Sequence, residues 1–223
     1  MYFDLNIPVV GHLDRTSRDK LTLILHRLSQ YDDKVVVALN YTLKKYSTTK
    51  LPELVAPVEY DNMKILRRIT MDTDIVLEES VWETLASNYD LVALRTSDRA
   101  VFERACESNH IDIISLHCTE RLEFTLDPMK VQRATQNGIY FELQYGPGIR
   151  DDKSRGFVYQ LGHALISCQI PNHLVISSGA EIVSELRAPF DVYYFAKSFG
   201  LPNDLAKHPC WKNPESLVTS KAL

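Results

Sequence analysis

The stretch from Ile139 to Arg155 reads I-Y-F-E-L-Q-Y-G-P-G-I-R-D-D-K-S-R and decides the fold. Polar and apolar residues alternate over most of its first seven positions, which is the period of a β-strand whose two faces meet different surroundings. The sequence Gly146-Pro147-Gly148 then predicts a glycine-hinged loop. Asp151 and Asp152 are typical N-caps or first-turn acids of a helix. We therefore expect a buried strand, a loop and a helix start in succession.

Three basic side chains gather in this predicted loop. Arg150, Lys153 and Arg155 follow one another closely, so a single turn would hold them at the mouth of the next helix. Backbone N–H groups at a helix N-terminus also favour anions. The stretch therefore predicts a position where a phosphate group could bind.

Outward from this stretch, short β-branched runs alternate with amphipathic segments, which indicates an α/β fold. The second predicted strand contains V-V-V-A-L at residues 35–39, which is apolar on both faces, as a parallel strand covered by helices requires. The predicted strands are residues 3–10, 34–42, 64–71, 90–96, 112–118, 139–145 and 174–178. The predicted helices are residues 16–31, 78–89 and 154–169, with others beginning near Ser97 or Asp98, at Asp127-Pro128, at Pro189 and at Asn213-Pro214.

Seven strands in this alternation predict a distorted (β/α) barrel of the TIM type with about seven clear parallel strands and an irregular closing side. We treat residues 1–223 as a single barrel domain whose last short helix, at about residues 213–223, packs on the rim. The alternative is an open doubly wound sheet. Residues 43–60 contain Pro52 and Pro57 and predict a loop or a poorly formed helix.

The composition is that of a soluble globular protein, with 45% hydrophobic and 24% charged residues. No apolar run approaches the roughly 20 residues of a membrane span, so we expect no membrane partner. The four cysteines form no C-x-x-C pair and are expected to be reduced thiols. A formal net charge of −4 implies that any contact with RNA is local or shared with a protein partner.

The predicted strand ends offer little catalytic chemistry, although the carboxyl ends of barrel strands are where active sites form. Asp4, His117 and Glu181 are the most that these ends supply toward a metal site, so no metal, cofactor or catalytic residue is predicted. We expect His117 to be a hydrogen-bonded core or rim residue. Ser177 and Ser178 are expected to cap a following helix, with Glu181 in the capping-box position, or to bond a phosphate.

Further motifs lie at strand and helix ends along nearly the whole chain. They are D-L-N at residues 4–6, F-E-L-x-Y and I-R-D within residues 141–151, I-S-S-G-A-E at residues 176–181, L-R-A-P-F-D-V at residues 186–192 and F-G-L-P at residues 199–202. With these motifs the sequence resembles the thirty-kilodalton protein subunit family of ribonuclease P, which is shared with the related ribonuclease MRP. That resemblance implies a distorted barrel similar to the metal-dependent phosphoesterases of the polymerase and histidinol phosphatase class.

The comparison with those phosphoesterases implies that a metal site has been lost. They carry D-L-H-x-H at the first strand, where this chain has Asp4-Leu5-Asn6-Ile7-Pro8. Their S-D-A-H at the seventh strand corresponds here to Ser178-Gly179-Ala180-Glu181. Proline cannot ligate a metal and asparagine is a poor ligand, so the resemblance implies a barrel without the ancestral chemistry.

The resemblance further implies a noncatalytic component of an endoribonuclease complex. The catalytic RNA of ribonuclease P would remove the 5′ leader from precursor tRNA, and this chain would support that RNA. The implied partners are the catalytic RNA, precursor tRNA through the complex, a small sandwich-fold subunit in a heterodimer, and other ribonuclease P and MRP proteins. The implied location is the nucleus and nucleolus, or the cytoplasm if the source is archaeal.

Candidate RNA-binding residues are basic side chains near strand and helix ends, because arginine offers a planar fork to phosphate without regard to base. They are Arg150, Lys153, Arg155, Arg187, Arg67, Arg95, Lys130 and Arg133. Arg67 and its neighbour Arg68 must point to opposite faces of their strand, so one of them should face the barrel interior or its rim. Arg150 and Arg187 have an alternative role as interior ion pairs with Glu142, Asp151 or Glu181.

Two other functions stay open at this point. A metal-dependent phosphoesterase would bind a transition metal and hydrolyse phosphate esters. An RNA-independent interaction module would bind its protein partners whether or not the basic loop is intact. The aromatic residues Phe190, Tyr193 and Tyr194 are expected to serve core and rim packing in preference to base stacking.

Overall fold

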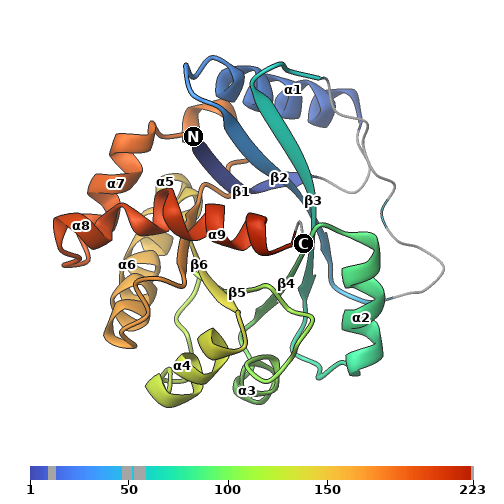
Figure 1. The fold of residues 1–223 in the computed structure, drawn as a ribbon, viewed down its shortest axis with the longest axis vertical. Helices are drawn as coiled ribbons and strands as arrows, with labels where there is room; N and C mark the ends of the chain where they lie inside the picture. The colour runs from blue at the N-terminus through green and yellow to red at the C-terminus, as the bar shows by residue number, and fades with distance from the viewer. Residues whose placement is uncertain (10–13, 47–51, 53–58, 222–223) are drawn as a thin grey trace.

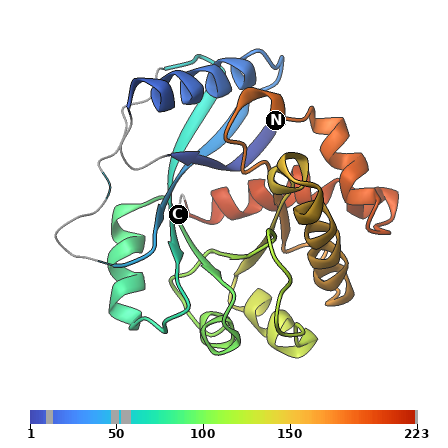
Figure 2. The same ribbon diagram turned by 180° about the vertical axis from the view of Figure 1, so that it is seen from behind.

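The computed structural model describes residues 1–9, 14–46, 52 and 59–221. These residues form a seven-stranded sheet in which neighbouring strands pair in parallel and in chain order. The strands are β1 (Tyr2–Val9), β2 (Val35–Leu43), β3 (Met63–Asp72), β4 (Leu91–Thr96), β5 (Ile113–Leu116), β6 (Tyr140–Gln144) and β7 (Leu174–Ser177). The sheet curls into a nearly closed barrel (Figures 1 and 2). The predicted barrel and its strands are confirmed, and the doubly wound alternative is wrong because the strand order never reverses.

Helices surround this sheet, and one of them, α9, lies across an end of the barrel, as Figure 1 shows. They are α1 (Arg15–Ser29), α2 (Glu79–Asn88), α3 (Arg99–Ala105), α4 (Pro128–Gln136), α5 (Gly146–Arg150), α6 (Asp152–Ser167), α7 (Pro189–Lys197), α8 (Asn203–Ala206) and α9 (Lys212–Ser220), with 3-10 turns η1 (Val183–Glu185) and η2 (His208–Cys210). The side chains of Asp98, Asp127 and Asp151 cap α3, α4 and α6, as predicted. Within the described ranges, no helix is long and apolar enough to cross a membrane.

Several predictions about the connections are wrong. The Gly146-Pro147-Gly148 segment is the short helix α5 and not a hinged loop. Ser177 and Ser178 do not cap a helix, because the next element is the turn η1. The short elements α8, η1 and η2 were not predicted. Of the predicted loop at residues 43–60, Leu43 belongs to β2, whereas residues 47–51 and 53–58 lie outside the described residues.

The barrel closes between β7 and β1 without a regular strand pairing. The backbone N–H of Gly179 donates to the carbonyl oxygen of Asn6 at 3.1 Å, and the N–H of Ser178 donates to Oδ1 of Asp4 at 3.1 Å. The carboxylate of Asp4 therefore makes one of the contacts that backbone hydrogen bonds between paired strands would otherwise make. The predicted irregular closing side is this junction.

A β-bulge in β1 sets which of its side chains enter the barrel. Asp4 pairs with Val37 and Ile7 with Leu39, so two residues of β1, Leu5 and Asn6, lie opposite the single residue between those partners on β2. Leu5 packs in the inner apolar cluster. The side chain of Asn6 also reaches the interior, where it donates to Glu142.

The amino-terminal half of the barrel interior is apolar, and α9 lies across that end (Figure 1). Leu217 of α9 is fully buried and packs among the inner residues. Asn213 ties the start of α9 to the carbonyl oxygens of Pro171 and Leu174, at 2.8 and 2.7 Å. The inner cluster that Leu217 joins consists of Phe3, Leu5, Val36, Ala38, Leu66, Leu91, Ala93, Ile113, Tyr140 and Val175.

Candidate functional site

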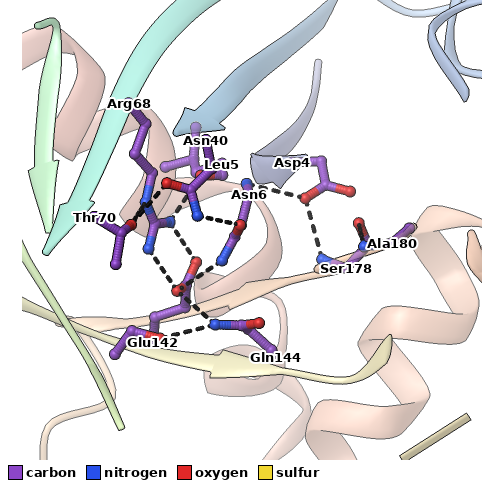
Figure 3. Close-up of polar contacts among 11 residues, drawn as sticks. Asp4, Leu5, Asn6, Asn40, Arg68, Thr70, Glu142, Gln144, Ser178 and Ala180 are labelled. Atoms are coloured by element: carbon purple, nitrogen blue, oxygen red, sulfur yellow. Dashed lines mark hydrogen bonds and ion pairs between the residues drawn. The ribbon is translucent and has the colours of Figure 1, made fainter. Parts of the chain in front are cut away.

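A polar layer crosses the barrel interior above this apolar half, and a buried ion pair lies at its centre (Figure 3). Arg68 of β3 and Glu142 of β6 meet in a bidentate contact, Nη1 to Oε1 at 2.6 Å and Nη2 to Oε2 at 2.7 Å. Neither side chain is exposed to solvent. Arg68 also donates to the carbonyl oxygen of Leu5 at 2.8 Å and to Thr70 at 3.3 Å. The prediction that Arg67 or Arg68 faces the interior is confirmed for Arg68.

Neutral side chains complete the hydrogen bonding of this layer. Asn6 donates to Glu142 at 3.1 Å and accepts from Asn40 at 2.8 Å. Asn40 in turn accepts from Thr70 at 2.7 Å. Gln144 donates to Glu142 at 3.3 Å. We name this set the interior polar layer: Asn6, Asn40, Arg68, Thr70, Ser115, Glu142 and Gln144.

The charge of Glu142 is fixed by its partner. Burial by itself would raise the pKa of this carboxyl, but the Arg68 guanidinium and the hydrogen bonds that Glu142 accepts outweigh burial and lower the pKa to about 2. The carboxylate is therefore ionised across the physiological range and is saturated by donors. Such a group is a poor metal ligand and a poor proton acceptor, so the geometry of the layer is that of a structural network.

The sequence motif D-L-N at β1 contributes to the closure of the barrel. Asp4 Oδ1 accepts from the backbone N–H of Asn6 at 3.3 Å and of Ser178 at 3.1 Å. Its Oδ2 is buried with no hydrogen-bond partner among the described residues. Burial raises the pKa of Asp4 to about 6. Gly179, at φ +57°, provides the turn that brings this segment across, and a Cβ there would lie 2.7 Å from Oε1 of Gln144.

At the carboxyl ends of β3, β4 and β5, three ionisable side chains form a separate rim cluster. Asp72 lies 3.1 Å from Nε2 of His117 and 4.0 Å from Arg95. Burial raises the pKa of Asp72, but the hydrogen bond and charge of His117, together with Arg95, lower it overall. The prediction of His117 as a hydrogen-bonded rim residue is confirmed. Among the described residues, no three His, Cys, Asp or Glu side chains are grouped as metal ligands would be.

Arg150, a predicted RNA-binding residue, is engaged in ion pairs. Its Nη1 donates to Glu185 at 2.6 Å and to the carbonyl oxygen of Gly179 at 3.1 Å, and its Nη2 lies 3.4 Å from Glu181. Glu185 is almost fully buried, so this contact fastens η1 to α5. The alternative role as an ion-paired residue is confirmed for Arg150 with Glu181, and the alternatives Glu142 and Asp151 are wrong.

Four other predicted residues also contact carboxylates and are spread over different elements. Arg95 belongs to the rim cluster described above. The other three pairs lie on the outer surface: Arg67 with Asp90 at 3.2 Å, Lys130 with Glu103 at 3.5 Å, and Arg133 with Glu107 at 3.9 Å. The structure therefore does not bring these four residues to the Arg150 region.

The remaining three predicted residues are Lys153 and Arg155 on α6 and Arg187 just before α7. We call these three the basic face, although only Arg155 and Arg187 line a common hollow. Arg155 donates from Nε to the carbonyl oxygen of Gly148 at 3.0 Å and pairs with the exposed Asp152. Arg187 donates to the carbonyl oxygens of Ser184 and Leu186, both at 2.9 Å. Because no described carboxylate lies within ion-pair distance of it, the alternative role as an ion pair is wrong for Arg187.

Sequence reasoning missed two features of this region. Glu185 and the Arg68–Glu142 pair were not assigned, because alternation put Arg67 and Arg68 on opposite faces of β3 without deciding which of them enters the barrel. The aromatic side chains of α7 make rim contacts, as expected: Phe190 and Tyr193 both contact Trp211, and Tyr194 contacts Tyr193, although Phe190 and Tyr194 are also exposed to solvent.

Comparison with known proteins places this geometry in a family. The chain is 34% identical over 134 residues to the Protein GAMETOPHYTE DEFECTIVE 1 of Arabidopsis thaliana, a match that covers 60% of this chain and 23% of that protein. It is 26% identical over 222 residues to the Probable ribonuclease P protein subunit 3 of Schizosaccharomyces pombe, covering 98% and 92%. The chain thus spans about a quarter of the length of the plant relative and nearly all of the yeast one.

A solved structure has the same fold. A chain in the cryo-EM structure of archaeal Ribonuclease P with mature tRNA superposes with a TM-score of 0.71 at 15% identity, covering 98% of this chain and 90% of that chain. The model of the family described as RNase P subunit p30 matches residues 1–223, the full extent of the sequence. The chain therefore belongs to the RNase P subunit p30 family.

Proposed function

We propose that this chain is a noncatalytic protein subunit of ribonuclease P, and also of the related ribonuclease MRP. In this role it supports the catalytic RNA while that RNA removes the 5′ leader from precursor tRNA. The observation that carries the proposal is the interior polar layer. A guanidinium lies in the barrel where a phosphoesterase of similar fold would gather carboxylates and imidazoles, and its charge is already neutralised by Glu142.

The outer surface supports a contact with RNA that is local. The basic face offers Arg155 and Arg187 with guanidinium N–H groups that no described residue accepts, and Lys153 is exposed at the start of α6. The net charge of −4 means that these cations act within an acidic protein. A protein of this charge needs a second, more basic surface to hold RNA firmly. The proposed heterodimer with a small sandwich-fold subunit would supply that surface.

The proposal includes the remaining partners and the location. Other ribonuclease P and MRP proteins complete the particle, and precursor tRNA meets this chain through the complex. The relatives from Arabidopsis thaliana and Schizosaccharomyces pombe are eukaryotic proteins, which supports the proposal of a location in the nucleus and nucleolus. Arg67, Arg95, Lys130 and Arg133 are weaker candidates for RNA contact, since each would have to leave a carboxylate partner first.

Purification of the chain from its own cells at mild salt tests this function. The RNA and proteins that accompany it would be sequenced and identified, and the preparation would be assayed for leader removal from precursor tRNA. We expect a structured RNA whose digestion by micrococcal nuclease abolishes cleavage. Proteins without RNA would support an interaction module, and cleavage by the RNA-free chain would support a phosphoesterase, so either result contradicts the proposal.

A further inference from the structure

A hollow of about 480 Å³ lies between α6 and α7, beside the basic face. This volume falls within the range of sites that bind small organic groups. Tyr145 forms part of the hollow and its hydroxyl accepts from the backbone N–H of Arg187 at 3.2 Å, which fixes that end. The lining includes Tyr145, Arg155, Tyr159, Arg187, Asp191 and Phe195.

One wall of the hollow is aromatic. Phe195 of α7 makes edge contacts with Tyr159 of α6 and with Tyr145, at centroid distances of 5.9 and 6.2 Å. Tyr159 is 38% exposed, so part of its ring is open to an incoming group. An aromatic face of this kind stacks on any planar base, because every base has a π-face.

Two guanidinium groups lie at the hollow and are held in place by backbone atoms. Arg155 is positioned by the carbonyl oxygen of Gly148, and Gly148 allows this approach because a Cβ there would lie 3.2 Å from Cα of Arg155. Arg187 uses only Nη1 in its contacts with described carbonyl oxygens. The pair of Arg155 with Asp152 is weak, because the Asp152 side chain is 90% exposed. Both guanidinium groups can therefore receive a phosphate, to which arginine binds with two parallel N–H donors.

The carboxylate of Asp191 also lines the hollow. A carboxylate accepts from the exocyclic amino groups of cytosine, adenine and guanine, which uracil lacks. The same carboxylate would repel an acidic peptide, which is the protein ligand that two arginines would otherwise attract. The combination of aromatic wall, carboxylate and guanidinium pair therefore matches a nucleotide better than a peptide.

We infer that this hollow binds one unstacked nucleotide of a single-stranded RNA segment, with an amino-bearing base. The base stacks on the exposed ring face of Tyr159 with its edge toward Phe195, its amino group donates to Asp191, and a flanking phosphate contacts Arg155 and Arg187. This inference deepens the proposed function and rests on it for the source of the RNA. It adds a base-selective contact to a surface that otherwise binds only phosphate.

The test uses the purified full chain and free nucleotides, so it does not depend on the particle. Affinities for AMP, CMP, GMP, UMP and inorganic phosphate would be measured by titration with NMR detection. We expect saturable binding in which CMP binds more tightly than UMP by about tenfold, the effect of one lost hydrogen bond to a charged acceptor. Arg187→Ala and Tyr159→Ala should each weaken CMP by about tenfold. In the Asp191→Asn variant, UMP should bind with the same affinity as CMP, because an amide can donate a hydrogen bond to the uracil carbonyl.

The matched control is Lys197→Ala, which removes a cation of α7 that does not line the hollow and should leave the affinity unchanged. Thermal unfolding of each variant shows whether it is folded, and Tyr159→Phe should retain binding where Tyr159→Ala loses it. Absence of saturable binding at millimolar nucleotide overturns the inference. So does equal binding of UMP and CMP, or binding of phosphate alone. A chain that binds CMP but co-purifies with no RNA would refute the proposed function while leaving the nucleotide site intact.

Discussion

Arg68 carries a positive charge into the barrel interior, where an unpaired guanidinium would be very unfavourable. The bidentate contact with Glu142 and the bond to the carbonyl oxygen of Leu5 compensate the lost hydration. Since a buried ion pair often contributes little net stability, its consequence is specificity: β3 and β6 must face each other in one register. The pair therefore fixes how β3 and β6 face each other across the interior, and each of its two charges is compensated by the other.

The pair predicts a strongly non-additive mutational cycle. Glu142→Gln leaves the Arg68 charge buried and uncompensated, and should lower the free energy of unfolding by about 3–5 kcal/mol. Arg68→Gln should also be costly. The double variant Arg68→Gln/Glu142→Gln should lose clearly less than the sum of the two, because neither charge remains. Urea unfolding at neutral pH measures all three, and simple additivity would show that the two side chains are not coupled.

Asp4 is the other buried charge with a consequence that can be measured. Burial raises its pKa from 3.8 to about 6, so the folded protein holds a proton on this carboxyl up to about pH 6. The unfolded chain releases the same proton near pH 4. Between these values the folded state binds more protons, and the free energy of unfolding falls as pH rises.

Asp4→Asn should remove this dependence. The amide keeps the acceptor for the N–H groups of Asn6 and Ser178 but does not titrate. Relative to the variant, the wild-type protein should lose about 3 kcal/mol of unfolding free energy between pH 4 and pH 7. Glu142, whose pKa is lowered to about 2 in the folded state, contributes equally to both proteins and therefore cancels in this difference. Parallel stability curves for the two proteins would show that Asp4 titrates normally.

At the scale of elements, α5 is a helix that packing imposes on a sequence with poor helix propensity. The N–H of Gly146 donates to the carbonyl oxygen of Ser178 at 2.8 Å, and a Cβ at Gly146 would collide with that oxygen. The helix therefore exists because β7 and its following turn lie directly against it. Arg150, at its end, then reaches Glu185 and holds η1 in place.

Two glycine substitutions separate packing from propensity. Gly146→Ala should lower the free energy of unfolding by about 1–3 kcal/mol, because the new methyl group forces the backbone of residue 178 away. Gly156→Ala, in the middle of α6, meets nothing within 4 Å and should raise stability by about 0.5–1 kcal/mol. Thermal or urea unfolding of both variants makes the comparison. Equal changes in stability for the two variants would mean that the backbone of Gly146 does not stay close to the carbonyl oxygen of Ser178.

The strands could be predicted from the sequence, whereas α5 and the partner of Arg68 could not. The strands follow from their composition, because a parallel strand covered on both faces is apolar and β-branched. Helix α5 could not be predicted, since Gly-Pro-Gly favours turns and only the tertiary contact with Ser178 overrides that preference. The partner of Arg68 was equally hidden. Alternation puts Arg67 and Arg68 on opposite faces of their strand without deciding which one enters the barrel. Strand order and register decide that Arg68 meets Glu142.

At the scale of the whole molecule, the barrel separates structural from exposed charges. The interior polar layer, the rim cluster and the Arg150 pairs hold the fold, whereas the basic face lies outside. The sequence predicted RNA contact for Arg150 together with Lys153 and Arg155. Because Arg150 pairs with the buried Glu185, reversing its charge would disturb the fold, so it is left out of a charge-reversal experiment on RNA contact. Lys153, Arg155 and Arg187 can be changed without removing a buried partner.

The variant Lys153→Glu/Arg155→Glu/Arg187→Glu should weaken crosslinking of this chain to RNA in the assembled particle by about tenfold or more, because it reverses three phosphate-facing charges. Its thermal stability should stay close to that of the wild type. The charge-matched control is Arg15→Glu/Arg18→Glu/Lys20→Glu on α1, whose side chains are exposed on another part of the molecule (Figure 1). Equal crosslinking losses in both variants would indicate bulk electrostatics and contradict a local contact.

The most direct test of the account is the rate of leader removal by reconstituted particles that contain the Arg68→Gln/Glu142→Gln variant, measured below its unfolding temperature. If the barrel interior is structural and the RNA performs the cleavage, a particle that assembles normally should cleave precursor tRNA at the wild-type rate. A large loss of rate in fully assembled particles would place the interior of this chain in the reaction and contradict the account.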